Sequence, residues 1–317
     1  MAKFKVYYTI ELNEVATHIF ESNDFEVKLC SHNDEETYVK ELAEFQPDAI
    51  TAKMMDTCKN LKVIGKQGAG LDNIDMDHAH AKDITVVYAP AGNANAVAEH
   101  AVMLMLMCAK RFTYVDRQFR GGNFLVRMGM EHTYELGGKT LGMIGCGRIS
   151  QLAMQKCKYG FGMNVIGYDP YLTQDKIGDL CELKATAKEV WEQADFVSVH
   201  LPVVPSTEHS IGREQFSWMK PTASFINCAR GALIKENELV ECLKDGTLFQ
   251  AGLDVFEHEP IQESSRELFN LDNVIMTPHM AATTEQSVLN CCTSVANDIV
   301  AVCNGQEPKV KAQKPKF

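Results

Sequence analysis

Two series of short apolar runs constrain the fold of this 317-residue chain more than any other feature. The first series has runs rich in β-branched and aromatic residues at 4–9, 25–30, 49–51, 61–66 and 84–89. The second series has six runs, at 140–145, 163–169, 195–200, 223–229, 248–255 and 273–279. Helix-like stretches separate the runs, and strands that alternate with helices form parallel sheets covered by helices. The sequence therefore predicts an α/β protein with two doubly wound parallel sheets.

The order of the two series predicts that one domain is inserted into another. The chain exceeds the size at which a single hydrophobic core usually stops growing. A long apolar helix is expected to begin at Asn95, and the last apolar helix, 284–303, is expected to return to the first domain. We therefore predict a discontinuous domain of residues 1–95 and 285–317, and a second domain of residues 96–284.

The charge of the chain narrows its possible partners. A formal net charge of −11 argues against a nucleic-acid partner, because a phosphate backbone needs a basic face. An anionic substrate would need a local cationic pocket. The most apolar helix-like stretch, 96–109, contains Glu99 and His100 and is too short and too charged to span a membrane. The first apolar run is too short for a signal peptide, so we expect a cytoplasmic protein without membrane partners.

The cysteines and histidines predict neither disulfides nor a metal site. The 11 cysteines are scattered without a C-x-x-C pair, and most lie inside apolar runs, so we expect reduced and mostly buried thiols. His78 and His80 have the spacing of metal ligands only on a strand, whereas their segment predicts a helix with a solvated face. The lysine-rich end, 309–317, is the one segment expected to be disordered.

The clearest local motif is a glycine-rich turn between a predicted strand and a predicted helix. Gly145 permits a tight turn, Gly147 lets a pyrophosphate approach the backbone, and the helix N-terminus stabilises its charge. Asp169 ends the next strand, where it would accept hydrogen bonds from ribose hydroxyls and repel a 2′-phosphate. Ser150 replaces the usual third glycine. A lone glycine pair would be only a tight turn, but this context predicts a site for NAD rather than NADP.

Three further segments follow in order, FINCARG at 225–231, LDVFEHEP at 253–260 and TPH at 277–279, each at the end of a predicted strand. Together with GAGLDNID at 68–75 and AVAEHAVMLML at 96–106, they resemble the D-isomer-specific 2-hydroxyacid dehydrogenase family over nearly the whole chain. The resemblance implies a Rossmann NAD-binding domain inserted into a flavodoxin-like substrate domain. It also implies hydride transfer between NAD and a small 2-hydroxy or 2-keto acid.

The resemblance implies three catalytic residues. Arg230 would bind the substrate carboxylate, because a guanidinium forks onto a carboxylate and can polarise the adjacent carbonyl. His279 would be the acid–base, giving a proton to the nascent alkoxide or removing it. Glu259 would fix the tautomer of that imidazole and favour its protonated form. Glu257 and His258 are interpreted as solvated neighbours of Glu259.

Other residues match family positions that line the cofactor or the substrate. The cofactor positions implied by the resemblance and by the glycine motif are Gly145, Gly147, Arg148, Ile149, Asp169, His200, Pro202, Thr207, Cys228, Ala229 and Asp254. Asp254 resembles the aspartate that binds the nicotinamide carboxamide, and His200 is interpreted as structural or at the cofactor's edge. The turn Gly68, Ala69 and Gly70 resembles the loop whose backbone N–H groups hold the substrate carboxylate.

Two segments depart from the family pattern. Residues 48–61, beginning at Asp48, are shorter than their usual counterpart, which often supplies a side chain facing the substrate, and Lys53 is a candidate replacement. Residues 112–138 have little regular periodicity and are predicted to be a long loop that wraps around a neighbour. They resemble the family's dimerisation arm, although Asn123 and Phe124 stand where a tryptophan is common. A homodimer is therefore expected.

The substrate remains open at the level of sequence. The segment GKQGAGLDNID at 65–75 looks most like the phosphoglycerate dehydrogenase branch, with hydroxypyruvate or glyoxylate reductase as the alternative. A dehydrogenase impaired by its short segment is also possible. A different class, an NAD-sensing interaction protein like the co-repressors built on the same scaffold, keeps the same three residues. Turnover of a 2-keto acid would discriminate these classes.

Overall fold

The computed structural model describes residues 4–9, 13–32, 37–38, 40–42, 49–50, 55–72 and 74–313. These residues form two compact units. The first comprises Met1–Ala94 and Thr283–Phe317, and the second comprises Asn95–Ala282. The chain thus leaves the first unit, completes the second, and returns.

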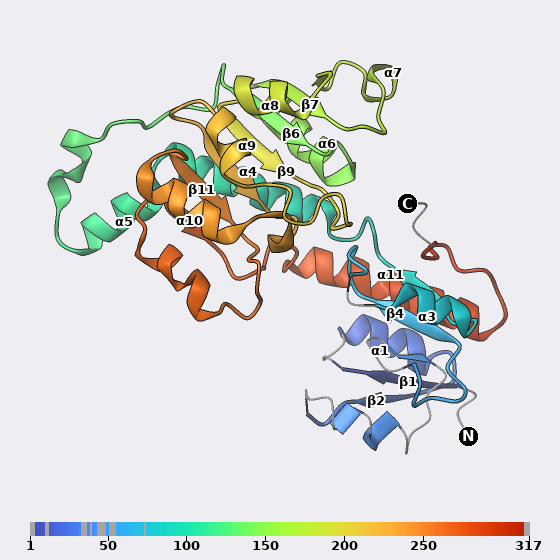
Figure 1. Ribbon diagram of the computed structural model, residues 1–317. Coiled ribbons are helices and arrows are strands. Elements are labelled where there is room, and N and C mark those ends of the chain that lie inside the picture. The colour runs from blue at the N-terminus through green and yellow to red at the C-terminus, as the bar shows by residue number, and fades with distance from the viewer. Residues whose placement is uncertain are drawn as a thin grey trace. The chain divides into compact units, whose positions relative to one another are not determined.

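The first unit contains a five-stranded parallel sheet (Figure 1). Its strands are β1 (Phe4–Tyr8), β2 (Phe25–Leu29), β3 (Ala49–Ile50), β4 (Val63–Lys66) and β5 (Thr85–Tyr88). They lie in the order β2-β1-β3-β4-β5, and each neighbouring pair is parallel. This is the flavodoxin-like strand order, so the predicted fold class is confirmed for this unit.

Successive side chains of a strand point to opposite faces of the sheet, and here both faces carry apolar side chains. Helices therefore cover both faces. Phe4, Val6 and Tyr8 pack in one cluster with α1 (Glu14–Glu21) and α11 (Glu285–Cys303), whereas Tyr7 faces the opposite cluster, which contains α3 (Met76–Ala81). The helix α11 lies close to the sheet: a Cβ on Gly65 would stand 2.6 Å from Ile299.

The end of the chain was predicted to be disordered, and this is wrong for its described part. Lys311 forms an antiparallel bridge with Val87, and the N–H of Ala312 donates to the carbonyl of Val86 at 2.8 Å. The backbone of Lys309 donates to the Asp298 carboxylate on α11 at 2.7 Å. Backbone pairing, which composition does not reveal, holds this segment on the first unit.

The second unit contains a seven-stranded parallel sheet. Its strands are β6 (Thr140–Ile144), β7 (Asn164–Tyr168), β8 (Glu182–Leu183), β9 (Phe196–Val199), β10 (Ser224–Asn227), β11 (Gln250–Leu253) and β12 (Val274–Met276). The order β12-β11-β10-β9-β6-β7-β8 is that of a Rossmann sheet with one further strand, β12. The sequence predicted the other six strands but missed β8, which has two residues and therefore no readable alternation.

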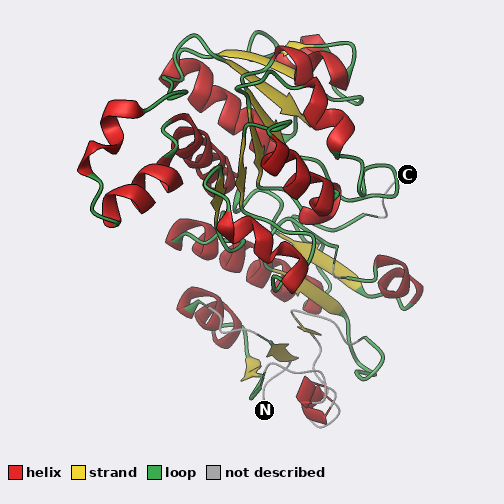
Figure 2. Ribbon diagram, turned by 60° about the vertical axis from the view of Figure 1, so that its left-hand side comes forward, coloured by secondary structure: helices red, strands yellow, loops and turns green. Residues whose placement is uncertain are grey.

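Helices cover both faces of the second sheet (Figure 2). The helices α4 (Ala94–Ala109) and α6 (Arg148–Gln155) pack on one face, and α8 (Ala187–Gln193), α9 (Arg213–Trp218) and α10 (Glu236–Asp245) on the other. Shorter helical segments complete the unit: η2 (Lys156–Gly160), α7 (Gln174–Ile177), η3 (Gly231–Leu233) and η4 (Glu263–Asn270). The segments between successive strands carry the chain back across the sheet, so that every strand runs in the same direction. The carboxyl ends of strands β6 to β12 therefore lie at one edge of the sheet.

The segment after α4 is helical rather than the long loop predicted from its weak periodicity. It forms α5 (Phe112–Arg120) and the 3-10 segment η1 (Phe124–Gly129), which project from the second unit (Figure 1). Neither element buries a side chain, so no apolar stripe meets a core. The nine residues of α5 are nevertheless amphipathic, so the sequence carried a short helical period that the prediction of a loop overlooked.

All 11 cysteines are free thiols, and the prediction that most are buried is confirmed, because only Cys30 is not. None of the helices in the described ranges is long and apolar enough to cross a membrane.

One glycine contact predicts a stability effect. A Cβ added to Gly231 would lie 1.9 Å from the backbone carbon and oxygen of Phe256, and backbone cannot move aside cheaply. We expect Gly231→Ala to lower the free energy of unfolding by about 3 kcal/mol, as for severe overpacking. Urea denaturation measures this change. The control is Gly160→Ala, where no atom lies within 4 Å of the added Cβ. Equal stability of the two variants would contradict the expected clash.

Candidate active site

The glycine turn between β6 and α6 has the shape that a pyrophosphate needs. Gly145 has φ +86°, and a Cβ there would lie 2.6 Å from the carbonyl oxygen of His200, so only glycine fits. Gly147 is the N-cap of α6, and no atom lies within 4 Å of the position its Cβ would take. The turn therefore leaves open space at a helix N-terminus, where the helix dipole and backbone N–H groups favour an anion.

Ser150 stands where the motif usually has its third glycine, and the structure gives it a role. Its side chain is fully buried and its hydroxyl donates to the carbonyl of Gly145 at 2.6 Å. The departure from the motif thus adds a hydrogen bond that closes the turn.

Asp169 lies at the end of β7 beside this turn. Its Oδ2 accepts from the N–H of Cys146 at 2.9 Å, and its Oδ1 accepts from the N–H of Tyr171 at 2.9 Å. A carboxylate has about four acceptor positions, so these two bonds orient the group and leave capacity for ribose hydroxyls. The residues present therefore fit the adenosine ribose of a dinucleotide.

The neighbouring strand ends carry the other candidate cofactor residues. Arg148 and Ile149 open α6. After β9, burial lowers the pKa of His200 to about 4, and its ring lies 2.9 Å from the Ser198 hydroxyl. A neutral His200 fits a structural role. The Thr207 hydroxyl donates to the carbonyl of Pro202 at 2.6 Å and so closes the loop that follows β9.

Arg230 follows β10 in a backbone loop held by Asn227, which sequence reasoning did not single out. The Asn227 amide donates to the carbonyl of Arg230 at 2.9 Å, and its oxygen accepts from the N–H of Ala229 at 2.9 Å. The guanidinium donates to the carbonyl of Ala229 at 2.7 Å. Cys228, in the same turn, is buried, and burial raises its pKa well above the ordinary value. Asn227 is fully buried, and its amide has both the donor and the acceptor that the two sides of this turn require.

The structure brings Glu259 and His279 into direct contact. Oε2 of Glu259 lies 2.6 Å from Nδ1 of His279, and Oε1 accepts from the N–H of Phe256 at 3.0 Å. The contact fixes Nδ1 as the nitrogen that faces the carboxylate, so Nε2 lies on the opposite edge of the ring. His279 has φ +50°, an uncommon conformation for a residue with a side chain. A carboxylate-oriented imidazole is the arrangement that general acid–base catalysis uses.

Asp254 does not lie with the exposed candidate residues. Its carboxylate is fully buried and accepts from the Thr277 hydroxyl at 2.6 Å and from the N–H groups of Met280 and Ala281, each at 2.9 Å. Burial alone would raise the pKa of Asp254, but hydrogen bonds from His100, Thr277 and these amides hold it below its usual value. In this structure the carboxylate binds the loop after β12.

The interpretation of Glu257 as a solvated neighbour is wrong. Its Oε1 lies 2.9 Å from Nε2 of His209, and its N–H donates to Glu236 at 2.9 Å. Glu236, Thr277 and His100 are partners that sequence reasoning did not recognise, because none is next to the motif residue it supports. His258 is exposed, as predicted.

The candidate substrate turn lies in the first unit, after β4. Gly68 has φ +128°, and its carbonyl accepts from the N–H of Ala89 at 3.0 Å. Ala69 and Gly70 follow it, and all three are half-buried. Asp48 and Lys53 lie outside the described residues.

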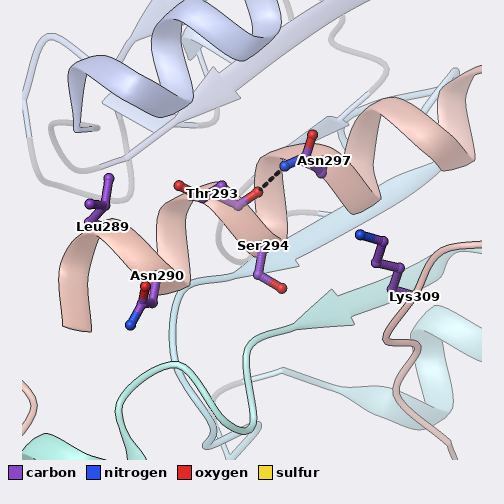
Figure 3. A pocket seen from close by; sticks show the side chains of 6 residues that line it. All are labelled: Leu289, Asn290, Thr293, Ser294, Asn297 and Lys309. Atoms are coloured by element: carbon purple, nitrogen blue, oxygen red, sulfur yellow. Dashed lines mark hydrogen bonds between the residues drawn. The ribbon is translucent and has the colours of Figure 1, made fainter. Parts of the chain in front are cut away.

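His78 and His80 lie on α3, as predicted, and His78 Nε2 stands 2.8 Å from Asp56. Across the described ranges no group of three or more His, Cys, Asp or Glu side chains could hold a metal ion. A hollow of about 460 Å³ lies along α11 (Figure 3) and is lined by Leu289, Asn290, Thr293, Ser294, Asn297 and Lys309. None of these is a candidate site residue.

Comparison with known proteins identifies the family. Residues 102–281 match the family model for the NAD binding domain of D-isomer specific 2-hydroxyacid dehydrogenases. The chain belongs to this family, and NAD is the cofactor of the matched domain.

Individual relatives agree with that assignment. The chain is 42% identical over 258 residues to a D-3-phosphoglycerate dehydrogenase of Methanocaldococcus jannaschii, covering 81% of this chain and 48% of the relative. It is 36% identical over 295 residues to a hydroxypyruvate reductase of Thermotoga maritima, covering 90% of this chain and 94% of the relative. The solved structure of a D-lactate dehydrogenase with NAD+ from Lactobacillus jensenii matches with a TM-score of 0.80 at 26% identity. The match covers 98% of this chain and 100% of the D-lactate dehydrogenase chain. The chain thus spans about half the length of the phosphoglycerate dehydrogenase.

The geometry of Asp169 predicts an effect on cofactor binding. We expect Asp169→Ala to weaken NADH binding by about 10-fold or more, because charged hydrogen bonds to the ribose contribute about 1.5–3 kcal/mol. Fluorescence titration measures the dissociation constants for NADH and NADPH, and discrimination against NADPH should fall. Asp175→Ala, at an exposed carboxylate on α7, is the matched control. Unchanged NADH affinity in Asp169→Ala would remove Asp169 from the site.

Proposed function

We propose that this chain is an NAD-dependent dehydrogenase that interconverts a small D-2-hydroxy acid and its 2-keto acid. The observation that carries the proposal is the 2.6 Å contact between Glu259 and His279 at the strand ends of an NAD-binding domain. In open α/β sheets, ligands bind outside the carboxyl ends of the strands. A carboxylate-oriented imidazole at that edge can exchange a proton with a substrate oxygen.

Each candidate residue then has a defined task. NAD, when bound, supplies or accepts the hydride. The Nε2 of His279 gives a proton to the carbonyl oxygen during reduction and takes it from the hydroxyl during oxidation. Glu259 holds the ring in the tautomer that this transfer requires. Arg230 binds the substrate carboxylate, for which a planar guanidinium is suited. Gly68, Ala69 and Gly70 are also proposed as substrate-binding residues, on the family resemblance alone.

For the substrate, we propose 3-phosphoglycerate and its keto acid. The support is the resemblance of residues 65–75 to the phosphoglycerate branch and the 42% identity to a D-3-phosphoglycerate dehydrogenase. Hydroxypyruvate is the second candidate, because the hydroxypyruvate reductase relative is 36% identical and is covered over 94% of its length. The free thiols are consistent with a cytoplasmic location, which we also propose.

A panel of acids tests this function. We expect NADH oxidation, followed by absorbance, with phosphohydroxypyruvate, hydroxypyruvate or glyoxylate, and His279→Ala should lower turnover by about 10²–10⁴-fold, the usual contribution of general acid–base catalysis. NADH affinity should be retained. The control is His258→Ala, an exposed histidine beside Glu259, which should keep full activity. An inert wild-type protein across the panel would refute the dehydrogenase proposal, and an active His279→Ala would refute the assigned acid–base.

We further propose that the protein is a homodimer joined by its projecting arm, α5 and η1. The support is a group of large apolar side chains that are 48% to 75% exposed: Phe112, Phe119, Phe124, Leu125 and Met128. Such a group is unfavourable in water, and an exposed apolar patch of this kind marks an interaction surface. Phe119 and Phe124 lie together, with ring centroids 6.2 Å apart, so the surface is continuous across the two elements.

Charge substitution on the arm tests the dimer. We expect Phe124→Glu combined with Met128→Glu to produce a monomer at micromolar concentration, because two carboxylates cannot be buried in an apolar interface without partners. Sedimentation velocity measures the mass. The control is Phe269→Glu, at an aromatic residue that is 50% exposed but lies on η4. A monomeric wild-type protein, or a variant that remains dimeric, would contradict the proposed interface.

A further inference from the structure

His100 on α4 lies within the hydrogen-bonded network under the His279 loop. Its Nε2 stands 2.8 Å from the Thr277 hydroxyl and 3.4 Å from Oδ1 of Asp254. Only 10% of its side chain is exposed, and Asp254 is fully buried. A buried histidine needs hydrogen-bond partners for its ring nitrogens, whereas an apolar side chain at the same position of α4 would need none. The question is therefore what the contacts of His100 with Thr277 and Asp254 do for the site.

The direction of the hydrogen bonds follows from the chemistry of the hydroxyl. Thr277 has one hydroxyl hydrogen, and it donates this hydrogen to Oδ1 of Asp254 at 2.6 Å. The hydroxyl can therefore only accept from His100, so Nε2 of His100 carries a hydrogen. The chain of bonds runs from His100 through Thr277 to Asp254.

Asp254 connects the His100–Thr277 hydrogen bond to the backbone around His279. Its carboxylate accepts the N–H groups of Met280 and Ala281, and its own carbonyl accepts the N–H of His279 at 2.7 Å. The backbone of His279 has φ +50°, which costs a residue with a Cβ about 1 kcal/mol. Such a conformation persists only when its surroundings determine it strongly. Here the surroundings are the bonds that converge on Asp254.

We propose that His100 is a positioning residue for the proton transfer. It acts through Thr277 and Asp254 on the 277–281 loop, and so keeps the His279 ring against Glu259. It touches none of the three candidate catalytic side chains in the contacts described above. This inference rests on the proposed function, because it assigns His279 as the acid–base.

The test compares two replacements of His100 with a packing control. His100→Leu keeps bulk but removes the donor, whereas the amide of His100→Gln can still donate to Thr277. Val102→Ala removes buried apolar volume from the same helix without touching the network. We expect His100→Leu to lower kcat by about 10-fold to 100-fold, since a displacement of about 1 Å has this effect, with KM for NADH unchanged. His100→Gln should recover most of the loss.

A second measurement does not depend on turnover. In cofactor-free protein labelled with ¹⁵N-histidine, the ring-nitrogen shifts report the tautomer of His279. We expect His100→Leu and Thr277→Val to change these shifts, and Val102→Ala and Thr277→Ser to leave them as in the wild type. The Thr277 pair also serves if His100→Leu does not fold.

The outcomes separate this inference from the proposed function. Unchanged His279 shifts in both His100→Leu and Thr277→Val would overturn the positioning role, whatever the enzyme's substrate. A loss of kcat in Val102→Ala equal to that in His100→Leu would also overturn it, because packing alone would then explain the effect. If the wild type reduces no acid in the panel, the proposed function fails, while the shifts still decide whether His100 holds the His279 ring.

Discussion

The buried carboxylate of Asp254 is the interaction on which the arrangement of the site depends. A charge without solvent must be compensated by donors, and here the donors are the Thr277 hydroxyl and two backbone N–H groups of the loop after β12. Because the carboxylate directly follows β11 and its donors follow β12, these hydrogen bonds fix the ends of two neighbouring strands to each other. The position of His279 is thus a consequence of where a buried charge finds its hydrogen bonds.

The parallel sheet supplies the other half of the arrangement. Neighbouring parallel strands end at the same edge, so Asp169 after β7, His200 after β9, Arg230 after β10 and His279 after β12 share that edge of the second unit. Local devices then give each strand end its own shape. Gly145 turns with a positive φ, and Asn227 holds the Arg230 turn from both sides. The sheet topology determines the edge at which ligands can bind, and a few short-range hydrogen bonds determine which side chains are presented at that edge.

Features that depend on local pattern were predictable, and features that depend on distant partners were not. The parallel sheets follow from alternating strands and helices, and the partnership of Glu259 and His279 was implied by the family resemblance. The β8 strand was missed because two residues carry no period, whereas α5 was interpreted as a loop although its nine residues carry a short helical period. His100, Thr277 and Glu236 were missed because each acts across a long stretch of chain. Glu257 was misassigned because its partner, His209, lies on another loop.

The return of the chain to the first unit has a consequence for how the protein is made. Cys291, Cys292, Val295, Ala296 and Ile299 of α11 belong to the same core cluster as the β1 side chains Phe4, Val6 and Tyr8. A ribosome synthesises β1 long before α11, so this core cannot close until α11 has emerged. The second unit, by contrast, is a continuous stretch from Asn95 to Ala282 and is complete earlier. The first unit is therefore the first to be synthesised in part and the last to complete its core.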